Sequence, residues 1–351
     1  MRRWVFIAIA AAVLLAGSTL PGTTAPAKVR FMVANPVINL GHTHLAVAQK
    51  RGYFKDADVD VDYLTSDGTV AVVRALASGA TDMGQADTLS IAAALAQGVD
   101  EVVAVCSYLA SNVYWVLARE DSPIQKVADL KGKKIGIASL GTGLYYNARV
   151  MLQDAGLSPE RDVEFVTIAQ PAAQLDALNK GAIDAVSTFD TILAIFQNQG
   201  ARLRLFSIRS GPMQWQWGVV AARKAFLEKN RPAVTGVCKA IQQAELYVRT
   251  SPKAALRVFK EWGGDVGTTP EEHAINIIRF RADSSFVTRP EGGHRWGWLP
   301  IEPMDELADL YFRLGLLKSK VGVKHVYSNA LLDQIQPDER RARSDAEKDA
   351  R

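Results

Sequence analysis

The segment KKIGIASLGTGLYYNARVML, residues 133–152, changes the spacing of its apolar residues part-way along. Ile135 and Ile137 belong to a short apolar run of the kind that forms a buried strand, whereas residues 148–152 begin the spacing of a helix. The segment therefore predicts a strand and a helix joined by a loop of small residues, namely Ser139, Gly141, Thr142 and Gly143. Backbone N–H groups of such a loop can approach an anionic or electron-rich ligand at the positive end of the helix.

The same loop is equally compatible with an ordinary strand-to-helix turn in which Thr142 caps the helix. Two nucleotide-binding motifs do not fit it. A Walker loop requires Lys and then Ser or Thr after the glycines, and neither follows here. The dinucleotide fingerprint requires a third glycine where Tyr146 stands.

The first 27 residues have the pattern of a cleaved secretory signal. Arg2 and Arg3 precede an apolar run over residues 4–17, and Ala-Pro-Ala at 25–27 is a suitable processing site. Ser18 stands where a bacterial lipoprotein would carry cysteine, so we expect no lipid anchor. The apolar run is shorter than the about 20 residues of a membrane span, although an uncleaved anchor stays an alternative. We therefore expect a mature protein in the periplasm, without a membrane span.

Charge and cysteine content narrow the class of protein. Without the two arginines of the leader, the 41 basic residues become 39, against 37 acidic ones. This near-balance argues against a nucleic-acid-binding protein, which would carry a basic face. The two cysteines, Cys106 and Cys238, could form a disulfide in an exported protein, but their apolar surroundings favour two buried thiols.

From residue 28 onward, strand-like and helix-like segments alternate, which predicts an α/β fold with mostly parallel sheets flanked by helices. A short unit is repeated: LASGATD at residues 76–82, followed by Asp87, is echoed by LNKGAID at 178–184, followed by Asp190. The repeat suggests two similar α/β lobes.

We predict that the second lobe is inserted into the first. The expected divisions are a signal peptide at 1–27, lobe 1 at 28–114 and 213–336, lobe 2 at 115–212, and a disordered charged tail at 337–351. The chain would cross between lobes near 111–114 and 211–217, which would form a hinge. The tail holds five acidic and five basic residues and almost no apolar ones, the composition of a disordered segment.

Three segments together resemble a known family: LAVAQKRGYF at 45–54, LASGATD at 76–82 and VADLKGKKIG at 127–136. The chain resembles the periplasmic solute-binding proteins of ABC importers for nitrate, taurine, alkanesulfonates and thiamine-pyrimidine precursors. The resemblance implies a type II periplasmic binding protein, in which two lobes close on a small ligand. The family usually has an acidic residue and a glycine before the second strand, and here residues 56–58, Asp-Ala-Asp, lack the glycine.

Ligands of parallel α/β sheets bind beyond the carboxyl ends of the strands. Applied to this chain, and joined with what the resemblance implies and with nearby aromatic residues, the rule gives these candidate ligand-binding residues: Asn35, Asn39, His42, Asp67, Thr69, Asp87, Thr88, Tyr108, Asn112, Ser139, Gly141, Thr142, Gly143, Tyr145, Asp190 and Trp215. Asp87 and Asp190 could instead cap helices. If both face the ligand, a purely anionic ligand is disfavoured without a cation nearby.

We therefore expect a monomeric protein that captures a small organic solute, a heterocycle, aromatic acid or sulfonate-like molecule, and delivers it to an inner-membrane ABC permease. No cofactor, metal or catalytic residue is expected, because His42 and His44 have no ligand set around them and no serine lies in a nucleophile elbow. Two alternatives stay open: an enzyme similar to the thiamine-pyrimidine synthases, and a periplasmic ligand-sensing module.

Overall fold

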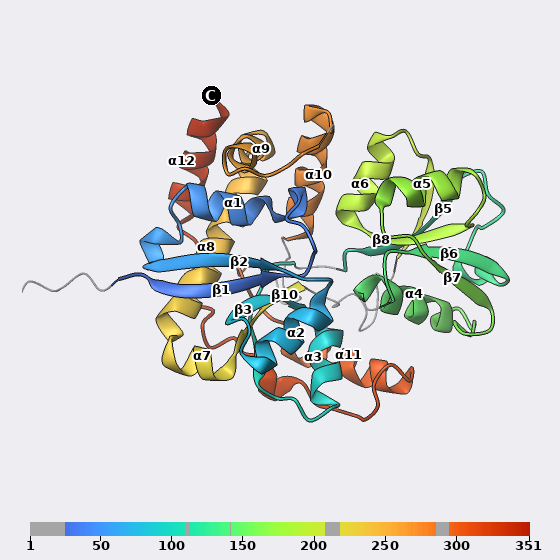
Figure 1. Ribbon diagram of the computed structural model, residues 1–351, viewed down its shortest axis with the longest axis horizontal. Helices are drawn as coiled ribbons and strands as arrows, with labels where there is room; N and C mark the ends of the chain where they lie inside the picture. Colours follow the sequence, from blue (N-terminus) through green and yellow to red (C-terminus); the bar gives the residue numbers. More distant parts are fainter. Residues whose placement is uncertain (1–24, 110–111, 141, 208–217, 268, 286–294) are drawn as a thin grey trace, which may run out of the picture.

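The computed structural model describes residues 25–109, 112–140, 142–207, 218–267, 269–285 and 295–351. The predicted signal peptide lies almost wholly outside these residues. Two five-stranded sheets stand side by side, each covered by helices (Figure 1). None of the helices in the described ranges is both long and apolar enough to cross a membrane.

The first sheet has the strand order β2-β1-β3-β10-β4. Its strands are β1 (Ala27–Val33), β2 (Val59–Thr65), β3 (Met83–Asp87), β4 (Val102–Ser107) and β10 (Gly218–Arg223). The second sheet has the order β7-β6-β8-β5-β9 and is built from β5 (Tyr114–Arg119), β6 (Lys133–Ile137), β7 (Val163–Thr167), β8 (Ala185–Phe189) and β9 (Leu203–Phe206).

The two sheets have the same topology. β1 pairs in parallel with β2 and β3, as β6 does with β7 and β8. In each sheet one strand runs against its neighbours: β10 is antiparallel to β3 and β4, and β5 is antiparallel to β8 and β9. Both are the first strands after the chain passes from one sheet to the other. The predicted α/β class is confirmed, with mixed sheets in which this one strand is reversed.

We call the body formed by the second sheet and its helices lobe 2, and the remainder lobe 1. The helices of lobe 2 are η3 (Val127–Leu130), α4 (Gly143–Asp154), α5 (Pro171–Asn179) and α6 (Asp190–Asn198). Lobe 1 contains η1 (Leu40–His42), α1 (Thr43–Lys50), η2 (Lys55–Ala57), α2 (Thr69–Ser78), α3 (Thr88–Leu95), α7 (Lys224–Lys229), α8 (Arg231–Thr250), α9 (Pro252–Glu261), α10 (Glu271–Ser284), α11 (Ile301–Arg313), η5 (Lys324–Val326) and α12 (Glu339–Ala350).

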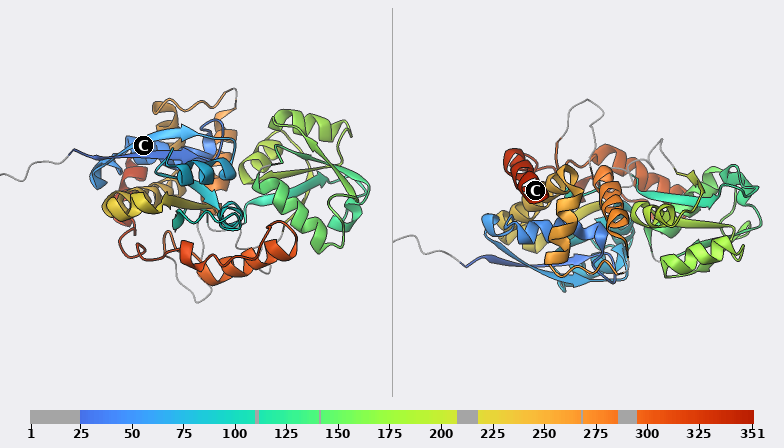
Figure 2. Two further views of the ribbon diagram at one scale, coloured as in Figure 1. Left: turned by 60° about the horizontal axis from the view of Figure 1, so that its bottom comes forward. Right: turned by 90° about the horizontal axis from the view of Figure 1, so that it is seen from above.

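Each sheet buries both faces. In lobe 1, α1, α8, α9 and α10 cover one apolar face and α2, α3 and α11 cover the other. In lobe 2, α4 covers one face of the sheet, and α5 and α6 cover the other. Among the contacts between the lobes, α10 lies along α6, and the turn after α11 reaches α4, where Gln153 Nε2 donates to the Leu314 carbonyl at 3.2 Å (Figures 1 and 2).

The sequence repeat has a structural basis. Gly79 and Gly181 both end helices with positive φ, +78° and +70°, which a side chain would strain. The aspartate three residues later then binds the first strand of its sheet. Asp82 Oδ2 accepts the Arg30 N–H at 3.1 Å, and Asp184 Oδ2 accepts the Lys134 N–H at 2.9 Å. The repeat therefore fixes a short strand beside β1 in one lobe and β6 in the other.

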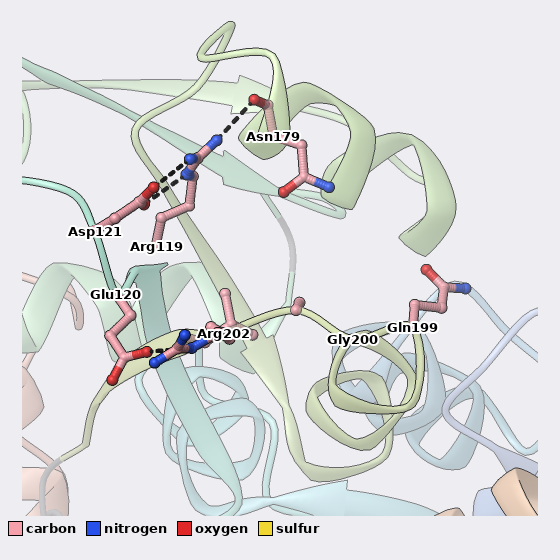
Figure 3. Close-up of a pocket in the computed structure, with 9 residues that line it drawn as sticks. Arg119, Glu120, Asp121, Asn179, Gln199, Gly200 and Arg202 are labelled. Carbon is pink, nitrogen blue, oxygen red and sulfur yellow. Dashed lines mark hydrogen bonds and ion pairs between the residues drawn. The ribbon is translucent and has the colours of Figure 1, made fainter.

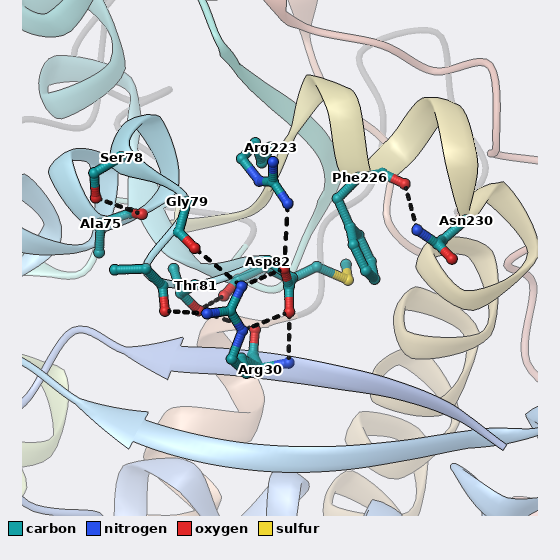
Figure 4. Close-up of polar contacts among 11 residues, drawn as sticks. Arg30, Ala75, Ser78, Gly79, Thr81, Asp82, Arg223, Phe226 and Asn230 are labelled. Atoms are coloured by element: carbon teal, nitrogen blue, oxygen red, sulfur yellow. Dashed lines mark hydrogen bonds and ion pairs between the residues drawn. The ribbon is translucent and has the colours of Figure 1, made fainter.

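Asp82 also holds a larger charged cluster. The Arg30 guanidinium donates to both Asp82 oxygens and to the carbonyls of Gly79 and Ala80, and Arg223 lies 3.6 Å from Asp82 on the opposite side (Figure 4). Asp82 has 9% of its side chain exposed, so its charge depends on these arginines.

We predict that Asp82→Asn lowers the free energy of unfolding by about 2 kcal/mol, because charged hydrogen bonds are replaced by weaker ones. The matched control is Asp184→Asn, whose partner Lys133 is 3.6 Å away with both side chains 35% exposed. The control should lose less than about 1 kcal/mol. Urea unfolding of both variants measures the difference, and equal losses would show that the arginine cluster adds nothing.

Two expectations from the sequence are wrong. Cys106 in β4 and Cys238 in α8 form a disulfide and are not two free thiols. The pairing arises because α8 packs across β4, which brings the two Cα atoms to 6.4 Å although 132 residues separate them. Apolar surroundings indicated burial correctly, but they do not distinguish a buried thiol from a buried disulfide.

The tail is not disordered: Glu339–Ala350 form the helix α12, which packs on α8. Ala342 and Ala346 are fully buried, and two tyrosine hydroxyls bind the same helix, Tyr53 to Asp345 and Tyr247 to Asp349. The prediction of disorder from composition is wrong because this highly charged helix docks through two buried alanines and two carboxylates that bind tyrosine hydroxyls. The buried face is narrow and contributes almost no apolar signal.

We predict that Ala346→Asp lowers the free energy of unfolding by about 3 kcal/mol, because it places an unpaired carboxylate in the α8 contact. Ser344→Asp, on the exposed face of the same helix, should change it by less than about 0.5 kcal/mol. Chemical denaturation of the full chain tests both. Similar behaviour of the two variants would mean that α12 does not contribute to stability.

The departure from the family pattern at residues 56–58 is accommodated in the backbone. Asp58 adopts the left-handed conformation, with φ of 52° and ψ of 37°. Aspartate tolerates this region better than most residues with a side chain. The turn before β2 therefore forms without the usual glycine.

Candidate functional site

The carboxyl ends of β3 and β6 meet where lobe 1 faces lobe 2. A small cavity of about 30 Å³ lies there, with walls from both lobes. It is lined by Thr69, Val70, Asp87, Leu89, Ser90, Ala93 and Leu316 from lobe 1 and by Gly143 and Tyr146 from lobe 2. Among the predicted site residues, the structure brings Thr69, Asp87 and Gly143 together at this cavity.

Two helices begin at the cavity without a side-chain cap. α2 follows Gly68, which has no side chain, and α4 follows Thr142, whose hydroxyl donates instead to the Ser139 carbonyl at 2.8 Å. Thr142 thus occupies the N-cap position without capping the helix. The first N–H groups of α2 and α4 have no side-chain acceptor from these positions, so the positive ends of both helices are directed to this site.

Asp87 combines both roles that the sequence left open. Its Oδ1 accepts the Ser90 N–H at 2.7 Å and so caps α3, while its Oδ2 accepts the Thr69 hydroxyl at 2.9 Å at the cavity wall. Burial raises the pKa of the Asp87 carboxyl, and the hydrogen bonds from Ser90 and Thr69 limit the rise. Asp87 is therefore a fixed hydrogen-bond acceptor beside two positive helix ends.

Position 143 needs a glycine, because another side chain packs closely against its Cα. A Cβ atom at this position would collide with the phenol of Tyr114, the first residue of β5. Tyr114 therefore rests on the start of α4, in the place that a larger residue at 143 would occupy.

The other predicted aspartate is engaged across the lobes. Asp190 begins α6, is 1% exposed, and accepts two hydrogen bonds from Arg281 Nη1 of α10, at 3.0 and 3.1 Å. Burial opposes the charge of Arg281, but the Asp190 carboxylate holds the pKa of Arg281 above its ordinary value. Sequence analysis missed Arg281, because it lies 91 residues from its partner in an ordinary-looking helix.

His42 is buried beside the loop after β1. The Asn39 N–H donates to His42 Nδ1 at 3.2 Å, and the Asn35 side-chain amide lies 3.4 Å from Nε2. Burial lowers the pKa of His42 to about 4, and the positive charge of Arg281 acts in the same direction. His42 is therefore neutral at physiological pH. Asn39 caps η1 by accepting the Gly41 N–H, which gives it a structural role as well.

A second buried pair lies behind His42. His44 Nδ1 is 3.2 Å from Glu245 Oε1, and Glu245 Oε2 accepts the Ser285 hydroxyl at 2.9 Å. Burial raises the pKa of Glu245 to about 7, and burial also lowers the pKa of His44 well below its ordinary value. Both shifts favour a pair without net charge. Clusters of three or more His, Cys, Asp or Glu side chains that could hold a metal do not occur among the described residues.

Glu245 makes stability depend on pH. Unfolded Glu245 releases its proton near 4.5, whereas folded Glu245 keeps it to about 7, so this group reduces stability by about 3 kcal/mol as pH rises through that window. We predict that Glu245→Gln removes this loss.

The measurement is urea unfolding between pH 4.5 and 8. The difference in unfolding free energy, Glu245→Gln minus wild type, should increase with pH by about 3 kcal/mol. Taking the difference removes the opposite contribution of His42, which raises stability as pH rises from about 4 to 6.5. The exposed Glu228→Gln is the control for loss of a carboxylate, and its unfolding free energy at pH 7 should lie within about 0.5 kcal/mol of wild type. A flat difference for Glu245→Gln would contradict the prediction.

The remaining predicted residues are placed around the cavity or away from it. The Tyr108 ring stacks on His44 at 6.2 Å, Asn112 accepts the Tyr114 N–H and donates to Asn147, and Thr88 is buried at the start of α3. Tyr145 packs on Phe165 inside lobe 2, so its neighbour Tyr146 lines the cavity instead. Asp67 is exposed in the loop before α2. Gly141 and Trp215 lie outside the described residues.

A larger hollow of about 490 Å³ lies on lobe 2, away from the cavity between the lobes (Figure 3). Its arginines are already paired, Arg119 with Asp121 and Arg202 with Glu120, and these side chains are 40% or more exposed. Exposed, neutralised pairs offer little binding energy to a ligand. The candidate site is therefore the cavity between the lobes, where buried polar groups and helix ends converge.

The chain matches a known protein family. The sequence model described as NMT1/THI5 like matches residues 39–255, which is more than half of the chain. The protein belongs to the NMT1/THI5-like family. The resemblance drawn from residues 45–54, 76–82 and 127–136 is therefore confirmed.

The chain is similar to bacterial proteins that are named for taurine binding and for thiamine biosynthesis. The chain is 29% identical to the taurine-binding periplasmic protein of Escherichia coli over 218 residues, covering 60% of this chain and 65% of that protein. It is 26% identical over 296 residues to a Haemophilus influenzae protein named for thiamine biosynthesis, covering 82% and 87%.

Solved structures share the fold. The alkanesulfonate-binding protein SsuA of Xanthomonas axonopodis pv. citri, bound to MOPS, superposes with a TM-score of 0.67 at 20% identity, covering 87% of this chain and 99% of that one. The periplasmic binding protein fold implied by the resemblance is thus confirmed.

Proposed function

We propose that this protein is the solute-binding component of an ABC importer, which captures a small molecule between its lobes. The observation that carries the proposal is the cavity at the carboxyl ends of β3 and β6, which is lined by both lobes and receives two uncapped helix starts. The names of the relatives support a binding role over an enzymatic one.

The ligand would be a compact molecule with an acidic head group. The starts of α2 and α4 favour an anion, and Asp87 beside them favours a hydrogen-bond donor on the same ligand. A sulfonate with an amine or hydroxyl nearby satisfies both. Arg281 balances Asp190, so the two aspartates together do not exclude an anionic ligand.

The lobes would have to separate for binding. A cavity of about 30 Å³ accommodates water but not an organic solute. The arrangement seen here is closed, with Tyr146 of lobe 2 lining the cavity opposite the residues of lobe 1 and Tyr114 lying against Gly143. Hinge motion between the lobes would admit the ligand and then enclose it.

The cellular setting follows from the same proposal. We infer a monomer in the periplasm that delivers its ligand to an inner-membrane permease. The predicted leader, the disulfide and the taurine-binding relative support this setting. The relative named for thiamine biosynthesis keeps a pyrimidine-type ligand as a second candidate.

Thermal-shift and calorimetric titration with taurine, ethanesulfonate, nitrate, benzoate and an aminopyrimidine test the proposal. A bound solute at 100 times its Kd adds about 2.7 kcal/mol of stability.

We predict that Ala93→Leu, which fills the cavity, weakens binding at least tenfold, whereas Ala94→Leu on the same helix does not. Unliganded Tm values verify folding of both variants. Binding that survives Ala93→Leu would place the site elsewhere, and turnover of a solute would favour an enzyme.

A further inference from the structure

The contact between α6 and α10 crosses from lobe 2 to lobe 1. At one end, Asn198 donates to the His273 carbonyl and accepts from Asn276, both at 3.1 Å. At the other end, next to the carboxyl end of β8, lies the pair Asp190–Arg281. Within the described ranges, no other ion pair joins the two lobes.

Because this pair is buried, it can affect whether the lobes stay closed. Asp190 has 1% of its side chain exposed and Arg281 has 13%. If the lobes separated, each group would gain water. In the closed arrangement both have lost water, so each charge needs the other. Removing one partner therefore penalises the closed state and leaves the open state almost unchanged.

The surroundings of Arg281 offer no replacement for Asp190. Tyr108 and His42 are uncharged neighbours, and the nearby Glu245 is occupied with His44 and Ser285. Asp190 Oδ1 also accepts the Thr191 N–H, so the carboxylate is held rigidly at the start of α6. Neither Asp190 nor Arg281 lines the cavity between the lobes.

We propose that Asp190 and Arg281 form an interlobe latch, and that Arg281 is a positioning residue that sets ligand affinity by stabilising the closed lobes. This inference rests on the proposed solute-binding function. A ligand enclosed by both lobes binds in proportion to the closed population, so a weaker latch raises Kd without touching a ligand contact.

The experiment compares Asp190→Asn, Arg281→Gln and the double variant Asp190→Asn/Arg281→Gln. Each single variant should weaken taurine or ethanesulfonate binding at least tenfold, because it leaves one buried charge unpaired. The double variant should recover most of the affinity, because a neutral pair carries no unpaired charge. Arg279→Gln, which removes an exposed cation from the same helix, is the matched control and should bind like wild type.

A second readout needs no ligand. Spin labels at Val37→Cys and Leu140→Cys, two exposed apolar residues in the loops after β1 and β6, report the distance between the lobes. Single latch variants should shift this distance distribution to longer values, and the double variant should shift it back.

The outcomes separate the two proposals. If no probe solute binds wild type but the distances shift as expected, the solute proposal for these probes fails and the latch stands. Unchanged distances in Asp190→Asn and Arg281→Gln would overturn the latch. Loss of binding without a distance change, or additive losses in the double variant, would also overturn it and indicate direct contact with the ligand.

Discussion

Charge buried between two bodies must be paired, and this constraint governs how the lobes of the protein meet. Asp190 lies at the start of a helix in lobe 2 and pairs with Arg281 in a helix of lobe 1. The same need recurs within lobe 1, where Asp82 is held by Arg30 and Arg223, and where Glu245 stays near neutrality beside His44. Apolar packing builds each lobe, and the buried pair Asp190–Arg281 adds a charged contact between them.

One reversed strand in each sheet follows a crossing between the lobes, and the carboxyl ends of the parallel strands of both sheets lie toward the other lobe. β5 and β10 follow the crossings and pair antiparallel within otherwise parallel sheets. The carboxyl ends of the parallel strands therefore face the gap from both sides. Helix starts come to this edge because helices follow the parallel strands, so the proposed binding site needs no dedicated motif.

Much of this was accessible from the sequence because the signals are local. Apolar periodicity located the strands and helices, and the glycines at 79 and 181 marked the repeat that the structure explains through Asp82 and Asp184. Thr69, Asp87 and Gly143 were predicted because they lie at or shortly after the carboxyl ends of β2, β3 and β6, and the structure places all three at the cavity. Arg281, Glu245 and the disulfide were not, since each depends on contacts between distant segments. The sequence predicted Tyr145, but Tyr146 lines the cavity. Consecutive residues of a helix point in different directions, so an error of one residue selects a side chain on another face.

The disulfide joins the last strand before the chain leaves lobe 1 to the first long helix after it returns. All of lobe 2 and both crossings are thus enclosed in one covalent ring. A protease that cuts a surface turn of lobe 2 would divide the polypeptide but could not release either fragment. The nicked protein would migrate as two bands only after reduction, so an oxidising compartment protects this architecture even from a broken backbone.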